Sequence, residues 1–249
     1  LKVDTGLHRL GIPWDDTQSL TAPYSCSHLR VTGVFTHLAD TERLDEASQA
    51  RTREQLRRFR AAVDGLRSAG HAPETVHFQG SYGLLNYPGL PCGCARHGVL
   101  SAPGDATTAV LPLRPVLSLR ARVSQLHTLA AGEAAGYDGA YTAHRPTVLA
   151  TLSIGYADGI PRCLSGGKLR AIVRGQYAQG IGRICMDQLM LDVTGIEDVR
   201  VGDEAVFIGR QGDCVIYAEE LAENAGTITN ELFSRLGARV EGRCFRQEA

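Results

Sequence analysis

Lysine and cysteine are two of the side chains that form covalent bonds to substrates or cofactors in enzymes. Lys2 and Lys168 are the only lysines among its 26 basic residues, and the others are arginines. A reaction that passes through a lysine Schiff base therefore has at most two candidate nucleophiles in this chain.

The cysteines form no recognisable metal or disulfide pattern. Their number is odd, no two are spaced as C-x-x-C, and Cys92 and Cys94 have no second pair that would complete a zinc site. Reduced thiols are the expected state, and we expect no bound metal. The seven cysteines are Cys26, Cys92, Cys94, Cys163, Cys185, Cys214 and Cys244.

The charge balance excludes several classes of partner. Acidic and basic residues nearly cancel to a formal net charge of -1, which argues against a nucleic acid or an anionic membrane bound by bulk electrostatics. No apolar run is long enough to span a bilayer, and no signal peptide is visible. We therefore expect a cytoplasmic location. Leu1 lies inside a strand-like pattern, which favours a sequence that starts within a longer protein.

The first 105 residues alternate strand and helix patterns. A long helix is predicted over 41–69, with apolar residues at helical spacing and Gly70 as its stop. Strand, long helix and strand in this order are typical of a parallel α/β layer. A full (β/α)8 TIM barrel takes about 250 residues, so residues 1–105 predict only the later strands of one. The predicted strands are 1–4, 28–37, 74–79 and 94–100.

Residues 106–249 change to short apolar runs separated by glycine-bearing turns. This pattern predicts a mostly β domain, closed by two late helices over 217–225 and 229–236. The predicted strands are 116–123, 147–153, 169–173, 190–193 and 205–208.

Five short motifs in a fixed order resemble one family. They are residues 2–11 (KVDTGLHRLG), 35–37 (FTH), 95–98 (ARHG), 153–159 (SIGYADG) and 182–188 (GRICMDQ). Each is weak alone, but together they are similar to alanine racemases, in which a pyridoxal 5'-phosphate barrel precedes a β domain. The resemblance covers essentially the whole chain.

The resemblance implies which residues move protons. Tyr156 matches the tyrosine base, and its phenol, with an ordinary pKa of about 10, needs neighbours to act near neutral pH. His37 matches the histidine that supports this tyrosine, although a histidine in an apolar strand is by itself more typical of a packed core. Arg96 matches the arginine that faces the cofactor's pyridine nitrogen. Arginine keeps its proton, so that nitrogen should stay unprotonated. Without the family, a salt bridge would be the favoured interpretation of Arg96.

The resemblance also implies contacts to cofactor and substrate. Arg9 matches the arginine near the substrate carboxylate and the cofactor's phenolic oxygen, which suits a planar guanidinium. Lys2 matches a lysine that is carbamylated in some members and then holds Arg9; an unmodified lysine is the alternative. The phosphate is expected to contact Ser81 and the backbone N–H groups of Gly98 and Val99. A helix N-cap is an equally good interpretation of Ser81.

Two further residues imply an assembly. Met186 matches a residue whose backbone contacts the substrate carboxylate, and Arg183 matches one that lines the access channel. In the family, the equivalents of Tyr156 and Met186 serve the barrel of the other subunit, so a head-to-tail homodimer is expected.

The sequence departs from the family at the cofactor lysine. That lysine belongs to the first barrel strand, which would precede Leu1, and neither Lys2 nor Lys168 fits its role. The chain is therefore expected to be the C-terminal two-thirds of a racemase and inactive alone.

Asn230 stands where alanine racemases usually carry a tyrosine. A smaller amide suits a hydroxymethyl side chain, so serine joins alanine as an expected substrate. This resembles the serine/alanine racemases of vancomycin resistance, which have an N-terminal membrane domain, so the intact protein could carry such an anchor. A neutral surface replacement is the alternative for Asn230.

Two other functions stay open. The order Cys185, Met186 and Asp187 superficially resembles the β-domain cysteine and aspartate of related pyridoxal-phosphate decarboxylases that act on basic amino acids, although the flanking motifs favour a racemase. An inactive remnant, or a module that only dimerises, is the non-enzymatic alternative.

Overall fold

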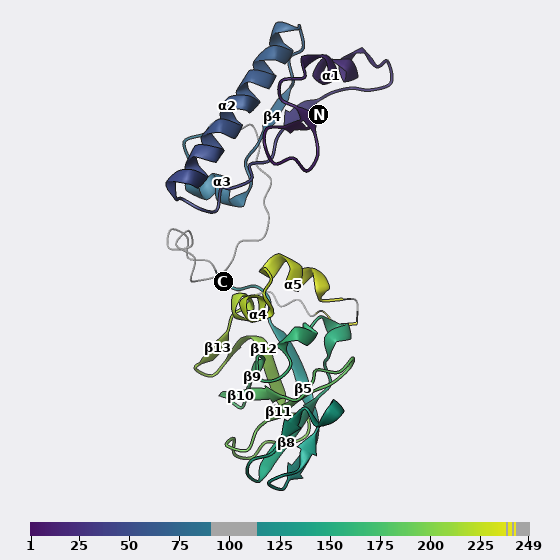
Figure 1. Cartoon of the computed structure of the whole chain (residues 1–249), viewed down its shortest axis with the longest axis vertical. Coiled ribbons are helices and arrows are strands. Elements are labelled where there is room, and N and C mark those ends of the chain that lie inside the picture. The colour runs from purple at the N-terminus through teal and green to yellow at the C-terminus, as the bar shows by residue number, and fades with distance from the viewer. Residues whose placement is uncertain (91–113, 238, 241, 243–249) are drawn as a thin grey trace, which may run out of the picture. The chain divides into compact units, whose positions relative to one another are not determined.

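The computed structural model describes residues 1–90, 114–237, 239–240 and 242 (Figure 1). The chain divides into two compact units, the first within Leu1–Leu100 and the second within Pro112–Ala249. The predicted strand 94–100 and the residues Arg96, Gly98 and Val99 lie outside the described residues.

Short parallel strands form the centre of the first unit. Strand β3 (Gly33–Phe35) pairs in parallel with β4 (Thr75–His77). A parallel bridge from Lys2 to Phe35 adds the start of β1 (Val3–Asp4) to the other side. Strand β2 (Ile12–Pro13) pairs with β1. The predicted strand 28–37 is thus reduced to three residues, whereas the parallel α/β layer is confirmed.

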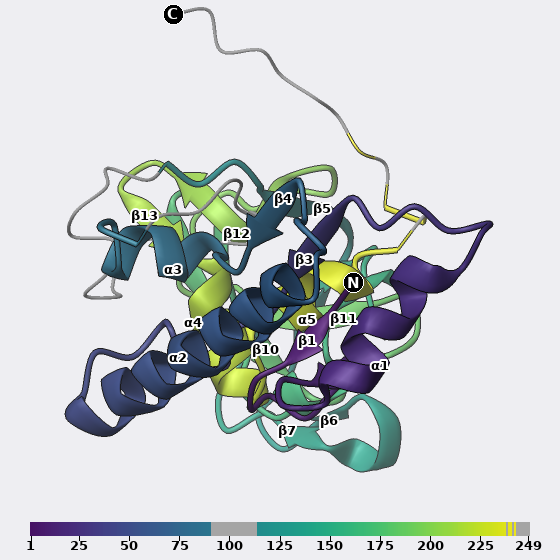
Figure 2. The same ribbon diagram turned by 90° about the horizontal axis from the view of Figure 1, so that it is seen from above.

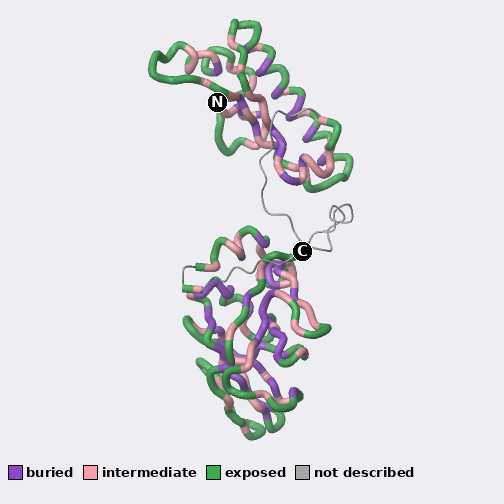
Figure 3. The backbone as a smooth tube through the Cα atoms, turned by 180° about the vertical axis from the view of Figure 1, so that it is seen from behind, coloured by how far each residue is buried: buried purple, intermediate pink, exposed green. Residues whose placement is uncertain are grey.

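One long helix covers this strip of strands. Helix α2 (Glu46–Ser68) begins after Asp45, whose carboxylate accepts hydrogen bonds from the N–H and hydroxyl of Ser48, as N-caps do. The buried side of α2, purple in Figure 3, shares one core with residues of the strands, and Figure 2 shows this helix and these strands from above. That core contains Val3, Val34, Leu56, Phe59, Val63 and Leu66.

Three shorter helices complete the first unit. Helix α1 (Thr17–Thr21) and the 3-10 turn η1 (Ala22–Ser25) lie between β2 and β3, and α3 (Ser81–Asn86) follows β4. The sequence predicted only a turn-rich segment where α3 lies.

The second unit is a closed antiparallel barrel. Its sheet runs in the order β13-β12-β5-β8-β11-β10-β9, and an additional pairing of β12 with β9 closes the ring. Closure leaves the six strands of the ring, β12, β5, β8, β11, β10 and β9, without a free edge, and β13 pairs with β12 outside the ring. The strands are β5 (Leu119–Leu129), β8 (Thr147–Leu152), β9 (Arg170–Val173), β10 (Gln176–Ile181), β11 (Leu189–Asp192), β12 (Glu204–Gln211) and β13 (Cys214–Ile216), and a small hairpin joins β6 (Ala134–Ala135) to β7 (Tyr141–Thr142).

The barrel is filled by apolar side chains and closed by two helices. Leu152, Ile172 and Phe207 are fully buried inside it, and each such side chain stabilises the fold by about 1.5–3 kcal/mol. Helices α4 (Ala218–Ala225) and α5 (Thr229–Arg235) follow the last strand. The predicted mostly β domain with two late helices is confirmed, although β10 and β13 were not predicted.

The described residues contain neither a membrane-spanning helix nor a cluster of potential metal ligands. None of their helices has the length and apolar character needed to cross a bilayer. Nor do three or more of their His, Cys, Asp and Glu side chains gather where they could hold a metal ion.

Candidate active site

The carboxyl ends of the parallel strands bring several candidate residues to one edge of the first unit. Residues that follow β1, β3 and β4 lie at this edge, because parallel strands end on the same side. His37 comes two residues after β3, and Ser81 comes four residues after β4. The edge is therefore the candidate site that the first unit contributes.

The loop after β1 is shaped by Asp4. Its carboxylate accepts hydrogen bonds from the backbone N–H groups of Gly6 and His8, both at 3.0 Å, and lies 3.1 Å from the ring Nδ1 of His8. Partial burial raises the pKa of Asp4, but these hydrogen bonds outweigh it and the pKa is lowered. The loop leaves Arg9 exposed, and the ammonium of Lys2 donates to the Leu10 carbonyl at 2.8 Å.

The end of β4 holds one histidine that sequence reasoning missed. The ring of His77 stacks on Phe35 with centroids 4.9 Å apart and nearly parallel planes. Both residues occupy the same register on neighbouring strands, on the side opposite the core with α2. The strand that contains His77 is only three residues long, so the sequence pattern does not indicate which side of the strand its ring faces.

Ser81 is the first residue of α3, and Gly80 is the N-cap. The N-cap interpretation of Ser81 is therefore wrong by one residue. Ser81 is buried, with 8% of its surface exposed, and it lies at the turn from a strand into a helix.

Two loops of the second unit are joined by their backbones. The N–H of Tyr156 donates to the Cys185 carbonyl, and the N–H of Ala157 donates to the Met186 carbonyl, each at 3.0 Å. Gly155 permits this approach, because a Cβ there would lie 2.3 Å from the Met186 carbonyl oxygen. The turn η4 (Tyr156–Asp158) is thus held against Met186 by contacts that need a glycine.

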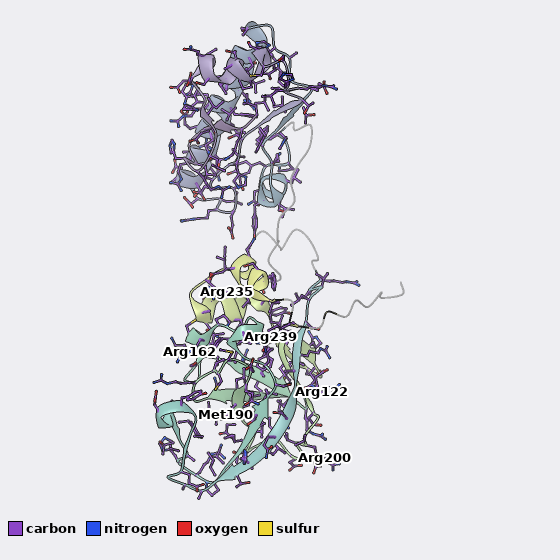
Figure 4. All side chains as sticks on the ribbon, turned by 90° about the vertical axis from the view of Figure 1, so that its right-hand side faces the viewer. Arg122, Arg162, Met190, Arg200, Arg235 and Arg239 are labelled. Carbon is purple, nitrogen blue, oxygen red and sulfur yellow. The ribbon has the colours of Figure 1, made fainter. Side chains whose placement is uncertain are left out.

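An arginine near the chain's end ties the same loops through their carboxylates. Arg239, labelled in Figure 4, donates to Asp187 at 2.5 Å and lies 3.5 Å from Asp158. Asp158 in turn accepts from the N–H of Gly155 at 2.9 Å. The hydrogen bond to Asp187 is the main reason that the pKa of Arg239 is raised.

An open hollow of about 670 Å³ lies beside Met186. The tyrosine that lines it is Tyr137, which is 67% exposed, and Tyr156 is not among its lining residues. Met190, labelled in Figure 4, forms another part of the wall.

The turn around Tyr137 is conformationally restricted. Gly136 before it and Asp138 after it both have positive φ, at 79° and 58°. The Asp138 carboxylate also pairs with Arg183 at 3.0 Å. No sequence motif singled out Tyr137, which is 49 positions from Met186; only the folded barrel brings it to the hollow.

The other candidates of the second unit are exposed. Asn230 is the second residue of α5 and is exposed. Lys168 is exposed in the turn before β9, so it is a poor candidate for a buried Schiff base.

Family profiles match nearly the whole chain. A profile described as the alanine racemase N-terminal domain matches residues 1–101. A second, described as the alanine racemase C-terminal domain, matches residues 116–244.

Curated relatives and a solved structure agree with these profiles. An amino-acid racemase of Enterococcus faecalis is 39% identical over 96% of this chain and 34% of its own length. A serine/alanine racemase of Enterococcus gallinarum is 35% identical over 98% of this chain and 34% of its own. The crystal structure of alanine racemase from Bacillus anthracis with bound L-Ala-P has a TM-score of 0.86 at 29% identity, over 96% of this chain and 62% of that one. The chain thus spans from about a third to under two thirds of the length of these proteins.

Proposed function

The chain belongs to the alanine racemase family, and from this premise we propose that the intact protein interconverts the L and D forms of a small amino acid with pyridoxal 5'-phosphate. The observation that carries the proposal is the pair of backbone hydrogen bonds that hold the turn of the exposed Tyr156 against Cys185 and Met186. An exposed phenol held beside a loop that is expected to bind substrate is suited to exchange a proton with Cα.

The first unit fits the phosphate of this cofactor. Ser81 offers a hydroxyl at the turn from β4 into α3, and hydroxyls and exposed amides at such turns suit an anion. Arg9 is exposed and adds a positive charge at the loop after β1. We assign Gly98 and Val99 to the same cradle and Arg96 to the pyridine nitrogen, as the family resemblance implies.

Neither lysine of this chain fits the covalent attachment. The Lys2 ammonium is engaged by the Leu10 carbonyl, and Lys168 is exposed on the barrel domain. We therefore propose that the attachment is made by a lysine outside these 249 residues. When bound, pyridoxal phosphate withdraws electrons from the amino acid and makes its Cα–H acidic.

Two tyrosines compete for the role of base. The family motif favours Tyr156, whereas the hollow favours Tyr137, which lines it together with Met186. Tyr156 is fixed by its backbone to Cys185 and is 40% exposed, so the same pair of loops places both this tyrosine and Met186. We propose Tyr156 as the base that delivers the proton and Tyr137 as a residue that lines the hollow beside Met186. We assign His37 to the support of the Tyr156 phenol, as the family resemblance implies.

A pair of matched variants tests this assignment. Tyr137→Phe and Tyr156→Phe each remove one hydroxyl from an exposed ring, so neither should disturb the fold. Loss of a positioned acid–base group costs about 10²–10⁴ in rate, and that loss is expected in Tyr156→Phe. The assay follows the optical rotation of L-alanine and L-serine. If Tyr137→Phe carries the large loss instead, the assignment of the base to Tyr156 is wrong.

The substrate is proposed to be alanine, serine or both. The serine/alanine racemase of E. gallinarum is among the relatives, and Asn230 offers an amide where a tyrosine is usual in alanine racemases. Asn230→Tyr is expected to lower kcat/KM for serine more than for alanine. An equal effect on both substrates would mean that Asn230 is a neutral surface residue.

The two halves of the site are proposed to meet across a homodimer. The hollow would then receive the barrel edge of the second subunit, which carries Ser81 and His37. Mixing His37→Ala with Tyr156→Phe subunits tests this, because each heterodimer regains one intact site. Recovery of up to about a quarter of wild-type activity is expected for random exchange in a two-fold dimer. No recovery after exchange, with dimers present, would place both halves in one subunit.

Two assignments need separate measurements. Mass spectrometry of the intact protein decides whether Lys2 carries a carbamate.

A decarboxylase is the second candidate function, since Cys185 also lines the hollow. The Cys185 thiol, however, is turned to the Arg183 carbonyl at 3.6 Å. Release of carbon dioxide from lysine or arginine without racemisation would favour that function.

A further inference from the structure

A buried glutamine of α2 contacts both loops that carry the first unit's candidate residues. Gln55 is 4% exposed. Its amide nitrogen donates to the Thr5 hydroxyl at 3.2 Å and to the His37 carbonyl at 3.4 Å. Its amide oxygen accepts from the Ala39 N–H at 2.8 Å. One side chain thus links the segment after β1 to the segment after β3.

The hydrogen bonds of this cluster run in one direction. Thr36 donates its hydroxyl proton to the Val3 carbonyl at 2.9 Å, so it must accept from Thr5, whose oxygen lies 2.9 Å away. Thr5 has then used its own proton and can accept from Gln55. In this relay of hydrogen bonds from Gln55 to the backbone of β1, the donor and the acceptor of every bond are fixed.

Neighbouring turns of α2 bind the same segments. Thr52 donates to the Asp40 carbonyl at 3.0 Å, and Arg58 donates to the Thr5 carbonyl at 3.2 Å. These residues lie three positions before and after Gln55, on one helix face. Gln55 is the member of this face that reaches both segments.

We propose that Gln55 is a positioning residue for the reaction, which sets the segments that carry Arg9 and His37 relative to one another. It touches neither substrate nor cofactor in this role, and the role in catalysis rests on the proposed function. Arg9 and His37 follow different strands and are 28 positions apart in sequence. Without the amide, the relative position of their segments depends on short strands, on the Thr5–Thr36 hydrogen bond and on the separate contacts of Thr52 and Arg58.

Methionine in place of the glutamine isolates the hydrogen bonds. Gln55→Met keeps a side chain of similar length but leaves the Ala39 N–H and the His37 carbonyl without their partner. Val63→Ala is the matched control, because Val63 is equally buried on α2 and packs only in the apolar core. Thr36→Val is a second test variant, which interrupts the relay without altering α2.

The experiment uses the protein at its natural length and compares two readouts. Hydrogen exchange of residues 5–9 and 37–40 reports how firmly the segments are held. Kinetics with L-alanine report the catalytic effect. In Gln55→Met and Thr36→Val both segments should exchange faster, and kcat/KM should fall on the order of 10- to 100-fold, since misplacement by about 1 Å has that cost. Val63→Ala should lower Tm while kcat/KM stays within about twofold of wild type.

The outcomes separate this proposal from the proposed function. Exchange in Gln55→Met that matches Val63→Ala overturns the positioning role, whatever the activity. Faster exchange with unchanged kcat/KM also overturns it. If the wild-type protein racemises neither alanine nor serine, the proposed function fails, while the exchange comparison still decides whether Gln55 holds the two segments.

Discussion

Gly155→Ala should uncouple the two loops that frame the hollow. The added Cβ would lie 2.3 Å from the Met186 carbonyl oxygen and 2.4 Å from that of Cys185, and real Cβ contacts below 3.0 Å are essentially never seen. Both neighbours are backbone atoms, so the loops must separate by at least about 0.7 Å.

The cost follows from the contacts that this separation breaks. Two backbone hydrogen bonds, from Tyr156 and Ala157, are lost, at about 1 kcal/mol each. Overpacking adds about 1–3 kcal/mol, giving about 3–5 kcal/mol in all. For a unit of this size, that corresponds to a Tm lowered by roughly 10–20 °C. Activity of the folded variant should fall as well, because Met186 moves.

Thermal unfolding followed by circular dichroism measures the effect. Gly195→Ala is the control, since a Cβ there meets no atom within 4 Å and its φ is not in the left-handed region; its Tm should stay within about 2 °C of wild type. A Gly155→Ala protein as stable and as active as Gly195→Ala would refute the contact between the loops.

Substitutions of Arg239 and of Glu54 test two further contacts. Arg239→Met removes a half-exposed ion pair, which contributes little to stability because solvent screens it. Tm should therefore barely move, whereas kcat/KM should fall a few-fold. An unchanged kcat/KM would show that the two loops do not need this ion pair. Hydrogen bonds from Arg57 and Arg58 lower the pKa of Glu54 from 4.5 to about 2 in the folded protein. The stabilisation that the Glu54 carboxylate contributes is therefore complete above about pH 4.5 and is lost as the pH falls toward 2. Glu54→Gln should therefore lower the urea midpoint at pH 7 but leave it unchanged at pH 2, and equal differences at both pH values would contradict the shift.

Element types were easier to predict than their ends. The stripe of α2 predicted a helix over 41–69, but the helix begins only at Glu46, because the Asp45 carboxylate caps it there. Strand β10 was missed because Gln176 and Gln179 make its sequence polar; both are exposed while Ala178 between them is buried. Strand β5 runs to Leu129, past the predicted end at 123, because its pairing with β8 continues.

Some residues of the candidate site could be predicted from the sequence and others could not. His37 and Ser81 could be located from motifs, since each follows a strand. Tyr137 and Gln55 could not be located in this way, because their places beside the hollow and between the two loops come from contacts between segments distant in sequence. A glutamine on an arginine-rich helix resembles any solvated residue until the loops fold over it.

Closure of the barrel has a consequence during synthesis. Strand β5 is flanked in the ring by β8 and β12, and the Arg120–Glu204 pair that joins β5 to β12 spans 84 residues. At about 5–20 residues per second, a ribosome needs roughly 4–17 s to deliver that partner. During this delay, the backbone groups of β5 that later face β12 remain open to pairing with other chains. The nascent second unit is therefore expected to depend on chaperones more than the first, whose strands and α2 meet over shorter separations.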